Sequence, residues 1–243
     1  MSKFIPILFS TPMVQAILEG RKTMTRRVVN FQKIAKQSGC TKGTLAYSDF
    51  FNSWAIFDGN YPDAELCLVN CPYGKVSDIL WVRETTYAYG WWSINTLGTK
   101  FNDATLDFGD YLYIDKPPSV SLKTKRSRII GWYKRPSIFM PKAACRIFLQ
   151  ITNIKVERLM DISEEDAKRE GVLLHERGVH WLDYQKQAWK VTQFVYCLLT
   201  AKDSFRSLWN LINGNDNRAF SENPFVWVVE FKLVEKPEGF INS

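Results

Sequence analysis

Charged and hydroxyl side chains are most concentrated in one short basic segment of this chain. Residues 20–27 have the sequence Gly-Arg-Lys-Thr-Met-Thr-Arg-Arg. After the glycine, four cations and two threonine hydroxyls occur within seven residues. Guanidinium and ammonium groups pair with anions, and hydroxyl groups both donate and accept hydrogen bonds. This combination predicts a site that receives an anionic or polar ligand such as a nucleotide.

Three interpretations of this basic segment remain open. A threonine hydroxyl becomes a nucleophile if a base takes its proton, and a desolvated lysine with a lowered pKa is such a base. Lys22 and Thr25 point to opposite faces of a regular strand, so they converge only if the chain turns or bulges after Gly20. On a plain strand Thr23, Thr25 and Arg27 share a face, which favours phosphate binding. In the structural interpretation, these residues hold the preceding helix against a sheet.

Two further groups of residues are candidates for ligand contacts. Arg83 and Glu84 end an apolar strand, where they form either a ligand contact or a salt bridge. Farther along, cations that can hold phosphates alternate with aromatic rings that can stack bases, although a solvated loop followed by a strand fits equally well. These residues are Lys123, Lys125, Arg126, Arg128, Trp132, Tyr133, Lys134 and Arg135. The pair Trp91-Trp92 is a stacking platform or an anchor for its segment.

Composition narrows the class of protein. The 243 residues are 46% hydrophobic and 14% aromatic, which excludes a mainly disordered chain. A net charge of +7 favours polyanionic partners. The scattered, odd number of cysteines predicts reduced thiols in a cytoplasm. Cys67 and Cys71 lack the usual zinc-knuckle spacing, so we expect no metal and no cofactor. No apolar run is long enough to predict a membrane span.

The pattern of apolar residues and turn signals predicts a mixed α+β fold. Strands outnumber helices, which suggests a small, partly closed β-barrel with peripheral helices. Less regular stretches at about 30–72, 87–135 and 173–203 are predicted to be insertions, the last with a helix within 181–200. The well-patterned elements are strands at 3–9, 79–84, 146–157 and 225–234, and helices at 11–19, 163–170 and 204–212.

With these segments in this order, the chain resembles ASCH-domain proteins, a branch of the PUA-like β-barrels, and within them the long versions encoded by bacteriophages and prophages. The resemblance implies one ASCH domain over residues 1–243, decorated by the three insertions. PUA-like domains generally engage RNA or modified bases. The resemblance therefore implies a protein that binds RNA or a modified nucleoside, with DNA as the alternative nucleic acid. It also implies a location in the cytoplasm of a bacterial host and no membrane association. Exposed apolar patches on the second or third insertion would instead favour an inhibitor or adaptor that binds a host protein.

One small ASCH group hydrolyses N(4)-acetylcytidine to cytidine and acetate, and it is similar to this chain at the motif Gly-Arg-Lys-Thr-x-Thr-x-Arg. Its catalytic lysine falls on Lys22 and its threonine nucleophile on Thr25. Its glutamate lies in the pattern Leu-Thr-Glu-x-x-Ala-x-x-Glu, which maps onto residues 162–170 and implies Glu170. Those enzymes are less than half as long, so the insertions here either shape a different pocket or cover it. The resemblance thus implies an amidohydrolase as the alternative function, with ligand contacts from Arg21, Thr23, Arg26 and Arg27.

Overall fold

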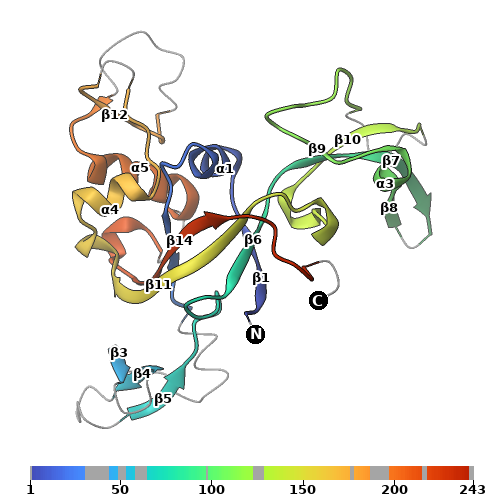
Figure 1. The fold of residues 1–243 in the computed structure, drawn as a ribbon. Coiled ribbons are helices and arrows are strands. Elements are labelled where there is room, and N and C mark those ends of the chain that lie inside the picture. Colours follow the sequence, from blue (N-terminus) through green and yellow to red (C-terminus); the bar gives the residue numbers. More distant parts are fainter. Residues whose placement is uncertain are drawn as a thin grey trace. The chain divides into compact units, whose positions relative to one another are not determined.

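The computed structural model has a mixed α+β fold (Figure 1) and describes residues 2–30, 44–48, 53–57, 65–96, 98–122, 129–175, 178–186, 197–214 and 218–240. The chain divides into two compact units. Unit 1 comprises residues 1–3, 16–78 and 150–232, and unit 2 comprises residues 4–15, 79–149 and 233–243. Among the described residues, no helix is long and apolar enough to cross a membrane.

Strands make up most of the regular structure. The α-helices are α1 (Thr11–Leu18), α3 (Thr105–Phe108), α4 (Glu164–Arg169) and α5 (Ala201–Asn213), and the 3-10 helices are η1 (Ser137–Phe139), η2 (Lys142–Ala144), η3 (Leu159–Asp161) and η6 (Phe220–Glu222). The strands are β1 (Phe4–Leu8), β2 (Met24–Val28), β3 (Thr44–Ser48), β4 (Ser53–Phe57), β5 (Glu65–Val69), β6 (Ile79–Arg83), β7 (Thr86–Asn95), β8 (Gly98–Asp103), β9 (Leu112–Tyr113), β10 (Gly131–Arg135), β11 (Phe148–Arg158), β12 (Trp181–Leu182), β13 (Cys197–Leu198) and β14 (Phe225–Val234).

In unit 1, strand β14 lies between β11 and β2. The antiparallel register of β2 and β14 is continuous, with Thr25 opposite Val229 and Arg26 opposite Val228. Because successive side chains of a strand alternate between its faces, Met24 and Arg26 share one face and Thr25 lies on the other. The Met24 face packs with Val226, Val228, Ala167 of α4 and Phe205 of α5 in one core cluster, and α4 and α5 lie side by side (Figure 1).

Local capping explains where α4 and α5 begin. The Ser163 hydroxyl accepts a hydrogen bond from the Asp166 backbone N–H at 3.0 Å, as expected for an N-cap residue. Thr200 caps α5 through the Asp203 backbone N–H at 3.0 Å, so this helix begins three residues before its predicted start. The Glu164 carboxylate also accepts from the first backbone N–H groups of α5, which ties the two helices together.

In unit 2, β1 pairs in parallel with β6, and the long strand β7 lies between β10 and β8. Strands β7 and β8 form an antiparallel hairpin, in which Asn95 of β7 pairs with Gly98 of β8. The core of this unit is aromatic, because Trp81, Phe148 and Phe240 pack together in one buried cluster. The second predicted insertion thus contains a sheet formed by β7, β8, β9 and β10.

The other two predicted insertions also carry sheet structure. Strands β3, β4 and β5 form a three-stranded sheet within residues 30–72. A helix is predicted within residues 181–200, but the described ends of this stretch form strands. Strands β12 and β13 pair antiparallel there, with Trp181 opposite Leu198, while residues 187–196 lie outside the described part.

Candidate functional site

The basic segment enters its site through a turn at the end of α1. Gly20 adopts a φ of 74°, a left-handed conformation that favours glycine, and its N–H donates to the Ile17 carbonyl. The Lys22 N–H then donates to the Ala16 carbonyl at 2.9 Å. Lys22 forms a single antiparallel bridge with Glu170, the residue that follows α4. The chain therefore turns after Gly20 before it enters β2.

Lys22 and Glu170 form a buried ion pair. The Lys22 Nζ donates to Glu170 Oε2 at 2.7 Å and to the Glu170 carbonyl at 2.9 Å. Their side chains are 0% and 4% exposed. Burial lowers the pKa of Lys22 because it disfavours the ammonium form, and the nearby charges of Arg27 and Arg26 act in the same direction. The Glu170 carboxylate opposes this shift without cancelling it.

Arg26 is surrounded by carboxylates of unit 1. Its Nε donates to Glu157 at 3.0 Å, its Nη2 to Asp166 at 2.9 Å, and its Nη1 to Glu170 at 3.2 Å. Burial alone would lower the pKa of Arg26, but Glu170 and Glu157 raise it overall. Because all three guanidinium nitrogens are engaged, this geometry favours a role in fixing β2 to β11 and α4 over a contact with a ligand phosphate.

The flanking residues of the motif are also tied to neighbouring groups. Arg21 donates to Glu19 at 2.7 Å and to the Gly171 carbonyl at 2.8 Å. The Thr23 hydroxyl accepts from Arg169 Nε at 3.3 Å. Arg21 and Thr23 thus hold the segment against the end of α4.

Thr25 and Arg27 occupy the other face of β2. Thr25 is only 1% exposed, and Arg27 is half-buried. Burial lowers the pKa of Arg27, against the opposing influence of Tyr73 and Glu170. The strand is regular from Met24 to Val28, so Thr25 and Arg27 share a face as the plain-strand alternative predicts.

The remaining candidates lie elsewhere. Arg83 and Glu84 belong to unit 2. The buried Glu84 carboxylate accepts from Arg146 Nε at 2.9 Å and Nη2 at 3.0 Å, which is the strand-end salt bridge considered above. Arg83 donates to the Ile138 carbonyl and lies over the Trp81 ring. Four predicted binding residues lie outside the described residues, namely Lys123, Lys125, Arg126 and Arg128.

Sequence reasoning missed the acidic partners of the basic segment. Glu157 lies in β11 and Asp166 in the first turn of α4, and both bind Arg26. Glu230 of β14 accepts from Arg169 Nη2 at 2.6 Å. A carboxylate inside the mostly apolar strand β14, as at Glu230, was the available signal, because such a group needs a cationic partner when it is partly buried. Glu157 lies in the more polar strand β11, where no such signal exists.

Comparison with family models, with curated proteins and with solved structures found no match for this chain.

Proposed function

We propose that this chain is a PUA-like ASCH-domain protein of the long phage type that binds RNA or a modified nucleoside through the segment around Lys22. One observation carries the proposal. Lys22 and Glu170 are 148 residues apart in sequence and are the lysine and glutamate that the ASCH resemblance assigns to one site, and their side chains meet at 2.7 Å.

The surroundings of this pair suit a nucleobase better than a phosphate. Lys22 and Thr25 are buried, and the pKa values of Lys22 and Arg27 are both lowered by burial. Buried donors and acceptors discriminate strongly between ligands, because an incorrect ligand leaves them unpaired. A modified base offers carbonyl and amide groups that match such donors and acceptors. Strands β2, β11 and β14, with α4 and α5 beside them, also fit a PUA-like barrel with peripheral helices.

A calorimetric titration tests this proposal. We expect N(4)-acetylcytidine, or single-stranded RNA, to bind the wild-type chain, and Glu170→Gln to weaken that binding because Lys22 loses the charge that orients it. Glu165→Gln, an exposed change one helical turn away in α4, is the matched control and leaves affinity unchanged. Absence of binding to both probes would overturn the proposal.

The alternative function is deacylation of N(4)-acetylcytidine-like nucleosides, and the lowered pKa of Lys22 favours it. In that reaction a neutral Lys22 takes the Thr25 hydroxyl proton, and the threonine oxygen attacks the acyl carbonyl. The amide C–N bond then breaks as the Lys22 ammonium returns the proton to the leaving cytidine amine. Water finally hydrolyses the threonine ester and releases acetate. The rate should then rise with pH through the Lys22 pKa, which lies below the usual 10.5, because only the neutral amine accepts a proton. A flat pH profile would contradict this alternative.

A third function, binding of a host protein, is favoured by exposed apolar side chains on the second and third insertions. Exposed apolar surface often marks a protein interface. The Phe108→Asp variant should then lose a host protein that co-purifies with the wild type, and an unchanged set of co-purifying proteins would contradict this function. The exposed residues are Leu106, Phe108, Val120, Val179 and Leu199.

A further inference from the structure

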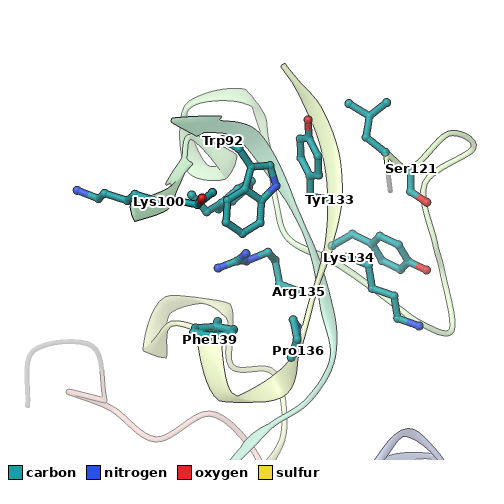
Figure 2. Close-up of a pocket in the computed structure, with 12 residues that line it drawn as sticks. Trp92, Lys100, Ser121, Tyr133, Lys134, Arg135, Pro136 and Phe139 are labelled. Atoms are coloured by element: carbon teal, nitrogen blue, oxygen red, sulfur yellow. The ribbon is translucent and has the colours of Figure 1, made fainter. Parts of the chain in front are cut away.

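Unit 2 contains a pocket of about 880 Å³, and the charged side chains among its described lining residues are all cationic. Its walls come from β7, β8, β10 and η1 (Figure 2). The described residues that line it include five aromatic and three cationic side chains and no carboxylate. These are Tyr87, Trp92, Phe101, Tyr133 and Phe139, with Lys100, Lys134 and Arg135, and also Thr99, Ser121, Leu122 and Pro136.

Arg135 is the centre of this pocket. Its guanidinium carbon lies 4.4 Å from the ring centre of Phe101, 4.8 Å from Trp92 and 4.9 Å from Phe139. In Figure 2 the side chain extends between the rings of Trp92 and Phe139. Rings in these positions stabilise the cation through their π-faces, but they offer no oxygen or nitrogen acceptor to the N–H groups of the guanidinium. The donor edge of the guanidinium therefore stays available to a ligand.

The described neighbours do not neutralise Arg135 by a hydrogen bond or an ion pair. Burial lowers its pKa, and the carboxylate that acts against this shift is Asp103. The two oxygens of Asp103 are engaged elsewhere, since they accept from the Thr105 hydroxyl at 2.6 Å and the Tyr111 hydroxyl at 2.9 Å. A partly buried guanidinium in this state favours binding of an anion, above all a phosphate, which it can hold through two parallel hydrogen bonds.

Trp92 contains a buried hydrogen-bond donor without a partner among the described residues. Its side chain lines the pocket, and the donor is the indole N–H. This N–H is closed off from solvent, so Trp92 contributes its ring to the pocket wall and no hydrogen bond to a ligand. The exposed Phe139 ring offers a π-face on which a base can stack.

We propose that this pocket binds a nucleotide, with its phosphate on Arg135 and its base against the aromatic wall that includes Trp92 and Phe139. In Figure 2 Lys100 and Lys134 extend away from Arg135, so Arg135 is the residue that holds the phosphate. This division between cations for phosphate and rings for bases is typical of single-strand recognition. The nucleotide is either free or part of a single-stranded RNA. The site lies in unit 2 and does not depend on the Lys22–Glu170 pair.

The test is the affinity of a short, fluorescently labelled oligouridylate, measured by anisotropy at low salt. Phe139→Ala removes an exposed ring that stacks a base, so the affinity should fall about 5- to 100-fold. Arg135→Lys keeps the charge but loses the planar pair of donors, so the affinity should fall as well. Leu211→Ala and Arg206→Lys, both exposed on α5, are the matched controls and leave the affinity unchanged.

Competition with unlabelled uridine monophosphate separates the two sources of the nucleotide. Displacement of the oligonucleotide assigns the pocket to a free nucleotide, and its absence, with affinity still dependent on Arg135, assigns it to an RNA strand. Wild-type affinity in both Arg135→Lys and Phe139→Ala, or no binding of either probe, would overturn the inference. Binding that is lost in Glu170→Gln and kept in both pocket variants would overturn the pocket and leave the function proposed for Lys22 standing.

Discussion

At the scale of single residues, the basic segment is balanced by acids that are distant in sequence. Arg26 alone contacts Glu157, Asp166 and Glu170, and its side chain is fully buried. A buried charge that has lost its partners is strongly destabilising, whereas a matched cluster is tolerated. Arg26 therefore contributes to the fold of unit 1 rather than to the positive surface that its sequence context suggests.

Arg26→Met should lower the free energy of unfolding by about 3–5 kcal/mol, because three carboxylates then lack their common partner. Urea denaturation measures this change. Arg206→Met is the control, since Arg206 forms an exposed pair with Asp203 on α5 and should cost less than about 1 kcal/mol. Equal losses in the two variants would show that the Arg26 contacts contribute nothing beyond surface pairing.

Thr25→Val tests the threonine that the resemblance assigns as nucleophile. Valine has nearly the same shape as threonine and lacks the hydroxyl, so the buried position should remain filled. If the chain deacylates N(4)-acetylcytidine, the turnover of this variant should fall by about 100-fold or more, the typical scale of an assisted proton transfer. Thr23→Val, whose hydroxyl contacts Arg169, should keep most of the activity. Equal rates in both variants would exclude Thr25 as nucleophile.

How far the sequence predicts the site depends on the residue. The pairing of Lys22 with Glu170 was anticipated only through the resemblance, because no spacing rule joins residues so far apart. Asp166 lies within the predicted helix 163–170, but its contact with Arg26 depends on tertiary packing. Trp92 and Arg135 were noted within aromatic and basic stretches, yet the pocket that unites them requires β7 to pair with β10.

At the scale of elements, the end of α4 determines where Lys22 lies. Gly171 has a φ of 86°, and a Cβ at this position would lie 2.8 Å from the Lys22 Cβ and 2.9 Å from the Ala16 Cβ. Real Cβ atoms do not approach so closely, so only glycine allows the chain after α4 to pass Lys22. The glycine that the sequence suggests as a helix stop therefore has a second function in packing.

Gly171→Ala should destabilise the chain more than Gly178→Ala. Both positions have positive φ and carry a strain of about 1–2 kcal/mol with alanine. A Cβ at Gly178 has no atom within 4 Å, whereas one at Gly171 displaces Lys22, which adds about 1–3 kcal/mol of overpacking. Thermal unfolding of the two variants gives the comparison, and similar melting temperatures would show that the contact with Lys22 relaxes without cost.

The elements predicted best are those with strong local signals. The strand at 225–234 and the capped helix after Ser163 were anticipated because alternation and capping act within a few residues. The start of α5 was placed too late because Thr200 follows an irregular stretch that offers no pattern. The described ends of the third insertion pair as β12 and β13, a contact that helical spacing along one segment does not reveal.

At the scale of the whole molecule, each unit contains a carboxylate whose pKa is lowered. Burial alone would raise the pKa of Glu230 in unit 1, but hydrogen bonds from Arg169 and Asn153 lower it below 4.5. Hydrogen bonds from Arg146 lower the pKa of Asp115 in unit 2 below 3.8. A carboxylate with a lowered folded pKa stabilises the fold above its unfolded pKa, and this contribution is lost as the pH falls through the folded value.

The melting temperature should therefore fall as the solution is acidified below about pH 4.5. Glu230→Gln should show a shallower fall, because glutamine does not titrate and the Arg169 contact no longer depends on pH. Glu165→Gln, which is exposed on α4, should follow the wild-type profile. A Glu230→Gln profile parallel to that of the wild type would show that Glu230 does not contribute to acid sensitivity.

Binding of RNA or a modified nucleoside to this chain can be measured directly at equilibrium. The probe is a single-stranded RNA that contains one N(4)-acetylcytidine, compared with the same RNA carrying cytidine, over a series of salt concentrations. We expect binding at low salt, a preference for the acetylated strand, and a log–log salt slope of about −0.7 for each phosphate contact. No binding of either strand at low salt would contradict the proposed function.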